Sequence, residues 1–491
     1  MPQPPDGQPR HPLELIDRKR VLDLLTEHLG NAWASFDRPR PSEPVPDVGL
    51  IQRLTEALPA APGDPEKALA DIASVLDASV SPARPLYAAY IGSTGLEAGV
   101  LAGALANAYD VNLAAAAGVA EKLENQTLRW VAEFVGYPYA EGVFTSGGMT
   151  SNLTALTAAR SRALPDCRRT GVFGARAAVY CSDEAHHSVA RAVEVIGLGS
   201  EALRRIPIDG RRRMRLDLLR EALSADVASG IVPVAVVATA GTTLTGAIDP
   251  LDGVADVCAE HGVWMHVDGA YGGPAAGVPS LAPEFAGIER ADSVTIDAHK
   301  WLGVQKSCSM VLMARAGDLE AAFAHDERYM LHAGVAANAV DRTLEYSRPV
   351  RSLKLWLAFR VYGADLMRAW IEQTAAHAQV LAAALAERPD FELLAQPSLS
   401  VVCFRHRPDR GAGSGRPASA SAASASAASA EQVDAHNLRL AQAITADGRV
   451  YLAPARVDGR TCLRVCFMNF RTDAAQVRQL LSVIDELART V

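Results

Sequence analysis

The pattern of hydrophobic positions changes character from Gly142 onward. Short, nearly unbroken apolar runs at Ala177–Cys181, Val232–Ala238 and Val263–Val267 alternate with helical patterns such as Leu251–His261. Continuous apolar runs are typical of strands buried on both faces of a parallel sheet, because half-exposed strands alternate polar and apolar residues. The alternation of strands and helices therefore predicts an α/β domain with a central, mostly parallel sheet.

Further elements flank these runs. Gly142–Thr145 is a predicted strand that leads through glycines into a helix over Ser151–Arg162, and Ser309–Ala314 is a predicted strand as well. Residues 97–136 are rich in alanine and contain no proline, which predicts helix throughout, ending before Pro138.

The two ends of the chain do not show this alternation of strands and helices. Helical patterns at Leu13–Leu29 and Glu66–Leu76 are joined by proline-rich linkers, and a long helical stretch at Leu353–Glu387 leads to strands at Leu399–Phe404 and Thr461–Phe467. We therefore expect three parts: an N-terminal helical segment over 1–95, a large α/β domain over 96–365, and a small C-terminal α+β domain over 366–491.

One segment of the C-terminal part has low complexity. Residues 411–432 consist largely of alanine, serine and glycine, GAGSGRPASASAASASAASAEQ. Such a segment has too little apolar surface to bury, so we expect a disordered surface loop inserted into the small domain.

Composition narrows the functional classes. Apolar residues make up 49% and charged residues 21%, with a formal net charge of −8, as in a soluble globular protein. The basic clusters are short and lack interleaved aromatics, so we expect no nucleic-acid partner. No apolar stretch resembles a signal peptide or a membrane span, and the seven cysteines are scattered without a CxxC pair. We therefore expect a cytoplasmic, reduced protein with no membrane association and no metal site.

Lysine chemistry has few candidates, because only six of the 48 basic residues are lysines. Lys300 stands in the segment DAHKWL, between two predicted buried strands. Lysine is almost never fully buried without a partner or a covalent role. Lys300 is thus a candidate for covalent chemistry, with an ordinary surface lysine on a turn as the alternative.

Asp268 lies at the carboxyl end of the strand predicted at Val263–Val267. Ligands of open α/β sheets bind at that edge, and an aspartate there can hold a heterocyclic nitrogen protonated. A helix cap is the alternative role for such a residue.

Two loops follow predicted strands. Thr145–Asn152, TSGGMTSN, joins a strand to a helix, and glycines before a helix let an anion approach free N–H groups. The segment SDEAHHS follows Ala177–Cys181, where an imidazole could stack on a flat cofactor. A lysine, an aspartate, a glycine turn and an aromatic stacker together fit pyridoxal 5'-phosphate (PLP), which needs a Schiff-base lysine and an acidic partner for its ring nitrogen.

The order of six segments strengthens this interpretation: TSGGMTSN, SDEAHHSV, ATAGTTLTGAID, HVDGAYGG, DAHKWL and RSLKLW. From about Arg84 to Val491 the chain resembles the group II pyridoxal-dependent decarboxylases, which include aromatic-L-amino-acid, glutamate, cysteine-sulfinate and L-2,4-diaminobutyrate decarboxylases. The resemblance implies PLP fold type I, the aspartate-aminotransferase-like fold, and an obligate homodimer with active sites at the subunit interface. The implied reaction is PLP-dependent decarboxylation of an L-amino acid to an amine and CO2.

The resemblance also implies residue roles. Lys300 would carry the cofactor, Asp268 would pair with its pyridine nitrogen, Ala270 would pack on the ring, and His186 would stack on the other face. Four residues would hold the phosphate: Gly148 and Met149 through their backbone, with Ser293 and His299. Thr243 and Asp249 would lie beside the ring. Many relatives have Asn where this chain has Asp297, and a second anion there speaks against a phosphate contact.

The resemblance extends to the substrate side. Tyr329 falls where relatives carry the tyrosine of a mobile loop that returns a proton to the substrate, although it could be an ordinary loop residue. Substrate contacts are expected from Tyr90, Asp110, Asn112 and Arg348. Asp110 and Asn112 would make the pocket more polar than in aromatic-acid enzymes and suit a distal ammonium. The alternative is that Asp110 pairs with an arginine across the dimer interface.

Two other functions stay open at this point. The same fold supports transamination and aldehyde-forming oxidative deamination, although aldehyde-forming relatives tend to replace the loop tyrosine with phenylalanine. A catalytically silent scaffold protein is the alternative of another class, and the joint presence of Lys300, Asp268 and His186 speaks against it.

Overall fold

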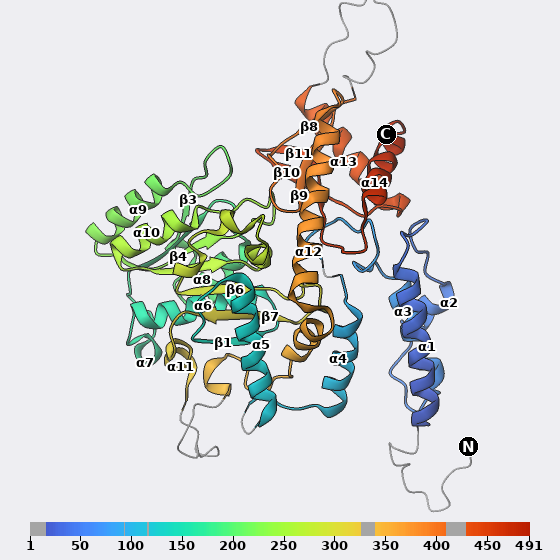
Figure 1. Ribbon diagram of the computed structural model, residues 1–491, viewed down its shortest axis with the longest axis horizontal. Coiled ribbons are helices and arrows are strands. Elements are labelled where there is room, and N and C mark those ends of the chain that lie inside the picture. The colour runs from blue at the N-terminus through green and yellow to red at the C-terminus, as the bar shows by residue number, and fades with distance from the viewer. Residues whose placement is uncertain (1–15, 93, 115–116, 326–338, 409–428) are drawn as a thin grey trace, which may run out of the picture.

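A seven-stranded sheet forms the centre of the molecule (Figure 1). The computed structural model describes residues 16–92, 94–114, 117–325, 339–408 and 429–491. The strands lie in the order β1-β7-β6-β5-β4-β2-β3. Their bounds are β1 Glu141–Thr145, β2 Ala177–Ser182, β3 Leu203–Ile206, β4 Val232–Thr239, β5 Trp264–Asp268, β6 Ser293–Ile296 and β7 Ser309–Met313. The five neighbouring strands β6, β5, β4, β2 and β3 are parallel to one another, and β7 runs antiparallel to both β6 and β1. The predicted mostly parallel α/β sheet is confirmed.

Helices cover both faces of this sheet because its strands are apolar on both sides. In β2, Ala178 and Tyr180 point into one core, whereas Val179 and Cys181 point into the other. The first core also takes side chains from α5, α9, α10 and α12, and the second takes them from α6, α8 and α11. The bounds of these helices are α5 Val119–Val135, α6 Gly148–Ala163, α8 His187–Val195, α9 Leu216–Ala228, α10 Leu251–His261, α11 Asp318–Phe323 and α12 Ser352–Ala386. The short helix α7 spans Cys167–Thr170.

The region from 97 to 136 is not one helix, as we expected, but two. α4 (Glu97–Tyr109) ends at Asp110, which has the left-handed conformation (φ 47°, ψ 43°). The next helix, α5, starts after Gly118, whose φ of 60° suits glycine. The alanine-rich sequence carries no strong signal for this break, because a left-handed C-cap is usually glycine or asparagine rather than aspartate.

The C-terminal part contains a second, antiparallel sheet in the order β10-β11-β9-β8. Its strands are β8 Phe391–Leu393, β9 Val401–His406, β10 Ala453–Val457 and β11 Arg460–Cys466. One face packs on the end of α12 and on α13 (Ala430–Asp447) and α14 (Ala474–Ala488) in a core of its own. The long helix α12 links the two parts and is kinked at Gly363 (φ 72°), two residues before the boundary predicted at 365.

Most of the predicted low-complexity loop, 411–428, lies outside the described residues. Its predicted end at Gln432 is too late, because α13 already begins at Ala430. Ser429 and Gln432 form a capping box there, in which each side chain bonds to the backbone of the other residue.

The N-terminal segment lies to the side of the main body in Figure 1. It contains α1 (Arg18–Phe36), α2 (Val48–Arg53) and α3 (Pro65–Asp77), and among these helices only Leu50 is buried. The first helix starts later than the predicted Leu13, at Arg18, because the Asp17 side chain caps it by accepting the Arg20 N–H.

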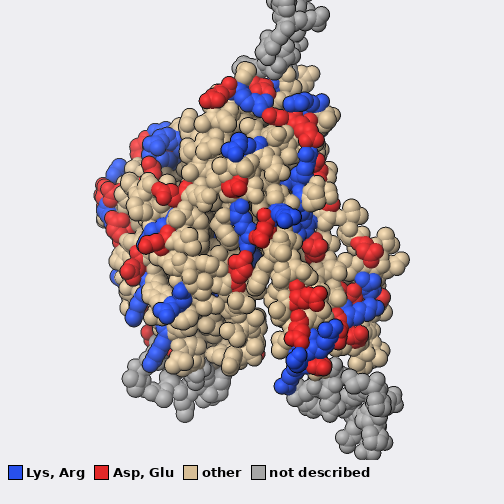
Figure 2. All heavy atoms as spheres, turned by 45° about the vertical axis from the view of Figure 1, so that its right-hand side comes forward, with Lys and Arg blue, Asp and Glu red and all other residues tan. Residues whose placement is uncertain are grey.

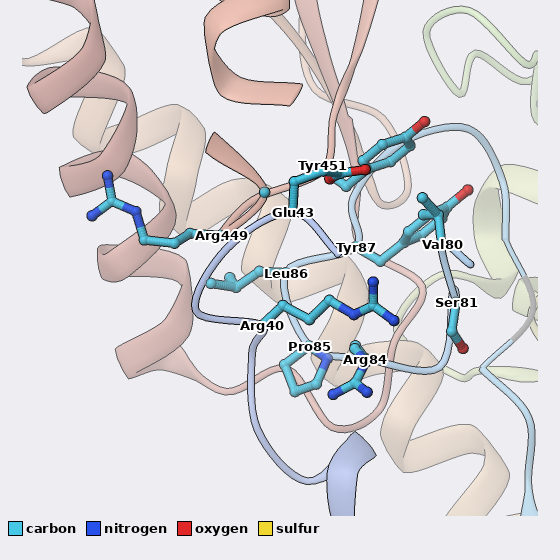
Figure 3. A pocket seen from close by; sticks show the side chains of 11 residues that line it. Arg40, Glu43, Val80, Ser81, Arg84, Pro85, Leu86, Tyr87, Arg449 and Tyr451 are labelled. Carbon is cyan, nitrogen blue, oxygen red and sulfur yellow. The ribbon is translucent and has the colours of Figure 1, made fainter. Parts of the chain in front are cut away.

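Contacts at one small pocket join this segment to the C-terminal part (Figure 3). Arg40 donates to the carbonyl of Ser79 (2.9 Å), and Arg84 donates to the hydroxyl of Ser35 (2.9 Å). Tyr87 stacks on Tyr451 with ring centroids 5.2 Å apart. Both arginines of the pocket therefore bond to residues of the N-terminal segment itself, and the Tyr87–Tyr451 stack connects that segment to the C-terminal part.

One face of the molecule shows no single dominant charge (Figure 2). On the face in Figure 2, basic and acidic side chains are interspersed rather than gathered into one patch. Among the described residues, no helix has the length and apolar character that crossing a bilayer would require.

Candidate active site

The carboxyl edge of the parallel strands carries the candidate chemistry. Asp268 is the last residue of β5 and is 5% exposed. Its neighbours in register are Thr239 at the end of β4 and Thr295 in β6. One carboxylate oxygen accepts the side-chain amide of Asn152 (2.8 Å), and the other accepts the backbone N–H of Ala270 (3.2 Å). Asp268 is therefore held as an acceptor at the edge where ligands of such sheets bind.

Lys300 lies in the turn that follows β6. Its Nζ is 3.0 Å from the Asp297 carboxylate, and 20% of its side chain is exposed. Asp297 also accepts the hydroxyl of Ser309, and His299 Nε2 lies 3.7 Å from it. Burial alone would raise the pKa of Asp297, but the nearby Lys300 and His299 and the hydrogen bonds from Ser309 and Lys300 together outweigh burial and hold that pKa below its usual value. The amine and carboxylate thus form a buried ion pair.

The predicted glycine turn packs directly on these groups. A Cβ on Gly148 would lie 2.9 Å from an Asp297 carboxylate oxygen and 3.2 Å from Ala270 Cβ. A Cβ on Gly147 would lie 3.9 Å from the ring of His299. The structure therefore brings the glycine turn, the Asp268–Ala270 turn and the Lys300 turn together, as predicted from their positions after strands. No side chain caps the start of α6, so its first N–H groups are available to an anion.

His186 approaches the same edge from the start of α8. Its Nδ1 lies 2.8 Å from the Ser188 hydroxyl and accepts the Ser188 N–H (3.2 Å). Burial lowers its pKa, and the nearby charge of Asp268 opposes that shift in part. The ring is therefore neutral at pH 7 and lies within the electrostatic reach of Asp268.

Three residues of the predicted site have other surroundings. Ser293 is fully buried at the opposite end of β6 from Asp297, and its hydroxyl bonds to Trp264 Nε1 (2.9 Å) and His266 Nδ1 (2.8 Å). A four-residue strand separates it from the Lys300 turn, so we leave Ser293 out of the proposed phosphate site.

Asp249 and Thr243 lie in the loop after β4. The Asp249 carboxylate accepts the backbone N–H groups of Thr239 (2.8 Å) and Met214 (2.7 Å), and burial raises its pKa to about 6. Its contacts hold the loop rather than facing Lys300. Thr243 is exposed.

The predicted substrate residues fall into two groups. Tyr90 and Asp110 both have positive φ and are exposed, Tyr90 by 59%. Asn112 and Arg348 are bonded to each other, since Asn112 Oδ1 accepts the Arg348 N–H (3.0 Å). None of the described hydrogen bonds joins these four residues to Lys300. Tyr329 lies outside the described residues.

Arg348 has a buried partner that the sequence did not reveal. Its guanidinium donates to both carboxylate oxygens of Glu124 (2.6 and 2.8 Å), and both side chains are at most 5% exposed. A bidentate geometry of this kind fixes α5 against the chain before α12. The pair thus gives Arg348 a structural partner within its own chain.

Arg348→Met is expected to lower the free energy of unfolding by about 3–5 kcal/mol, because it leaves the Glu124 carboxylate buried without its partner. The matched control is Arg220→Met, which breaks a solvent-exposed pair with Glu260 and should leave the free energy of unfolding nearly unchanged. Denaturant unfolding measures both. An Arg348→Met protein of unchanged stability and raised KM would instead mean that Arg348 serves only the substrate.

These residues fit PLP. Gly148 leaves room beside Asp297 and Ala270 that any side chain would fill, and α6 presents uncapped N–H groups next to it. The hydroxyls of Thr239 and Thr295, both in register with Asp268, are buried without a hydrogen-bond partner. The amine and the held carboxylate match the Schiff-base lysine and the ring-nitrogen partner that PLP requires, and the unpaired hydroxyls leave further polar groups free at the same edge. Of the residues involved, the sequence did not single out Asn152 or Ser309, although Asn152 stands within the quoted segment TSGGMTSN.

Comparison with known proteins agrees with the geometry. Residues 49–407 match the family described as "Pyridoxal-dependent decarboxylase conserved domain". An aromatic-L-amino-acid decarboxylase of Bacillus atrophaeus is 31% identical over 481 residues, covering 96% of this chain and 95% of the relative. An L-2,4-diaminobutyrate decarboxylase of Rhizobium meliloti (strain 1021) is 34% identical over 372 residues, covering 75% and 70%.

A solved structure of Oryza sativa TDC with PLP and tryptamine superposes with a TM-score of 0.88 at 27% identity, covering 98% of this chain and 99% of that one. The predicted PLP fold type I and the predicted cofactor are therefore both confirmed. The alternative of a silent scaffold gives way to a PLP-dependent carboxy-lyase. By its sequence match over most of its length, the chain belongs to the pyridoxal-dependent decarboxylase family.

Proposed function

We propose that Lys300, Asp268 and His186 form the reaction centre at which this enzyme removes the α-carboxyl group of an L-α-amino acid as CO2. The observation that carries the proposal is the meeting of the Lys300 ion pair, the Asp268 turn and the Gly147–Gly148 turn at one edge of the sheet. That edge is where α/β folds bind ligands.

PLP, when bound, supplies the electron sink that stabilises the charge left on the α-carbon after CO2 departs. Lys300 would hold the cofactor covalently through its Nζ and would carry protons beside the substrate. Asp268 would keep the ring nitrogen protonated, because a carboxylate stabilises a cation beside it. Its fixed hydrogen bonds to Asn152 and Ala270 orient it for that task.

Other residues would position the cofactor or cover its faces. The N–H groups of Gly148 and Met149 at the start of α6, with His299, would bind the phosphate. Ala270 and the neutral ring of His186 would cover the two faces of the cofactor. Asp297 would hold the Lys300 amine in place beside the cofactor site, since the two groups are paired at 3.0 Å. Tyr329 stays a predicted proton donor, and the aldehyde-forming alternative depends on that same residue.

For the substrate, we propose an amino acid with a second, distal polar or cationic group. Asp110 ends α4 with an exposed carboxylate, and Asn112 follows it before the buried Leu113. Tyr90 and Asp110 are exposed on this chain, and we propose that they line the site of a neighbouring subunit. A carboxylate in a partly enclosed pocket needs a cation, and a substrate ammonium would provide it.

CO2 release from diaminobutyrate, ornithine, tryptophan and DOPA by wild type and Asp110→Asn tests this substrate class. The variant is expected to lose about tenfold or more in kcat/KM for the two basic substrates, since it loses a charged hydrogen bond, and little for the aromatic ones. Equal losses on all four, or a wild type that prefers tryptophan or DOPA, would contradict the proposal. Equal losses would favour the pairing of Asp110 with an arginine across the interface.

We also propose a homodimer. Helices α1 to α4 expose large apolar side chains that the single chain does not cover: Leu22, Ile51, Leu54, Ile72, Leu76, Leu101, Leu105 and Tyr109. Exposed apolar surface on this scale marks an interface. A second copy is the occupant that would also complete the pocket with Tyr90 and Asp110.

Sedimentation is expected to give a species of twice 52.0 kDa. Replacing Leu101 and Leu105, which are 50% and 59% exposed on α4, with glutamate should yield monomers that release little CO2. A fully active species of 52.0 kDa would rule out the shared site.

A cytoplasmic location is part of the same proposal. All seven cysteines are free and buried, which suits a reducing compartment. Alkylation of freshly denatured protein from cells should label all seven.

A further inference from the structure

A file of consecutive hydrogen bonds, formed by the side chains of Trp264, Ser293, His266, Asn152 and Asp268, is buried next to the proposed reaction centre. It starts at Trp264, whose Nε1 donates to Ser293 Oγ (2.9 Å), and continues from Ser293 Oγ to His266 Nδ1 (2.8 Å). His266 Nε2 then bonds to Asn152 Oδ1 (3.1 Å), and Asn152 Nδ2 reaches Asp268 Oδ2 (2.8 Å). All five side chains are at most 5% exposed, so water does not compete for these bonds.

The chemistry of the partners fixes the direction of every bond in the file. A carboxylate only accepts, so Asn152 must turn its NH2 group toward Asp268. Its Oδ1 then faces His266, and the His266 hydrogen must therefore be on Nε2. Burial lowers the pKa of His266 to about 4, so this ring is neutral and its Nδ1 accepts the Ser293 hydroxyl. The file thus donates in one direction, from Trp264 to Asp268.

Asn152 also connects to His186, through a second arm of hydrogen bonds that passes by Ser188. The other hydrogen of Asn152 Nδ2 goes to Ser188 Oγ (3.0 Å), which leaves the Ser188 hydroxyl hydrogen for His186 Nδ1 (2.8 Å). The Ser188 backbone N–H points to the same ring nitrogen (3.2 Å). Nδ1 of His186 is therefore an acceptor, and the hydrogen of this neutral ring must be on Nε2.

We propose that Asn152 is a positioning residue that sets two properties of the reaction centre at once: the orientation of the Asp268 carboxylate and the Nε2–H tautomer of His186. This inference rests on the proposed function, in which Asp268 and His186 face the cofactor. Asp268 Oδ2 is held by Asn152 and Oδ1 by the Ala270 N–H, so the carboxylate cannot rotate away from the ring nitrogen.

Asn152→Leu has nearly the same volume and removes both arms. The PLP dissociation constant is expected to rise about 10- to 100-fold, the effect of losing a hydrogen bond to a buried charge. The pH at which the visible absorption band of the holoenzyme changes should shift as well. Asn152→Asp, which cannot donate when ionised, should weaken PLP binding more at pH 8 than at pH 5, because its protonated form regains one donor.

The matched control is Asn437→Leu. Asn437 is also fully buried and makes three bonds, donating to the carbonyls of His406 and Val433 and accepting the His406 N–H, but it lies in the C-terminal part. This variant should lower Tm while PLP affinity and the absorption titration stay as in wild type. If Asn152→Leu lowers Tm in the same way and binds PLP with unchanged affinity and spectrum, Asn152 is only structural and the proposal is wrong.

A neutron crystal structure of the wild-type holoenzyme tests the tautomers without any variant. Deuterium is expected on Nε2 of His266 and of His186 and on both Nδ2 positions of Asn152, and a deuteron on His186 Nδ1 would overturn the proposal. Failure of the underlying function is distinguishable: Asp268→Asn would then keep wild-type kcat. If Asp268→Asn is impaired and Asn152→Leu is not, only the role of Asn152 fails.

Discussion

Lys300→Ala is expected to abolish CO2 release, with kcat falling by about four orders of magnitude or more, the scale seen when the nucleophile of a covalent mechanism is lost. Among the described ion pairs, Lys300 is the one lysine paired with Asp297, and Asp297 packs against Gly148 of the glycine turn. Cofactor bound without a covalent link would also dissociate more readily. Steady-state assays at saturating PLP, together with the absorption spectrum, measure both effects.

Removing the amine also leaves Asp297 buried with only Ser309 and His299 as partners, so some loss of stability is expected in Lys300→Ala. Lys300→Arg separates the two effects because it keeps a cation beside Asp297 but cannot bond covalently to the cofactor. Lys300→Arg should be as inactive as Lys300→Ala and more stable. Turnover within tenfold of wild type in either variant would show that Lys300 does not carry the reaction.

Asp268→Asn is expected to lower kcat by about 100-fold or more while PLP stays attached to Lys300, because a neutral amide no longer stabilises a protonated ring nitrogen. In the structure the Asp268 carboxylate accepts from Asn152 and from the Ala270 N–H, and an amide NH2 would oppose one of these donors. The change therefore affects both charge and orientation. Kinetics with the full amino-acid panel and the holoenzyme spectrum are the measurements.

The control for Asp268→Asn is a second buried carboxylate near the same strand ends. Asp249 accepts two backbone N–H groups and holds the loop after β4, so Asp249→Asn should lower Tm more than kcat. If both variants lose activity in proportion to their loss of stability, Asp268 is not an electrostatic partner of the cofactor. A near-normal kcat in Asp268→Asn would contradict its role outright.

The core of the site could be predicted from the sequence because of how parallel sheets are built. Strands buried on both faces read as apolar runs, and polar residues directly after them must meet at one edge. In the structure Gly148 packs on Asp297 and Ala270, and the Ala270 N–H bonds to Asp268, so the predicted segments do meet at one edge. The strand pattern says nothing of Asn152, because a buried asparagine on a helix gives no periodic signal, and its partners are 36 and 116 residues away.

Three other features of the structure could not be predicted from the sequence, for physical reasons. Ser293 begins the four-residue β6, so it lies at the opposite end of that strand from Asp297. Arg348 and Glu124 are 224 residues apart, and no local pattern indicates a bidentate pair at such a separation. The break between α4 and α5 depends on a left-handed aspartate, Asp110, which a propensity argument assigns to helix.

The attachment of PLP to Lys300 is tested most directly by reducing the holoenzyme with borohydride, digesting it with trypsin and sequencing the labelled peptide. Trypsin does not cleave at a modified lysine, so the expected product runs from Ala291 to Lys306 and carries one reduced cofactor on Lys300. The Lys300→Arg protein should yield no labelled peptide. A label on Lys306 or Lys354 in the wild-type enzyme would contradict the proposed site.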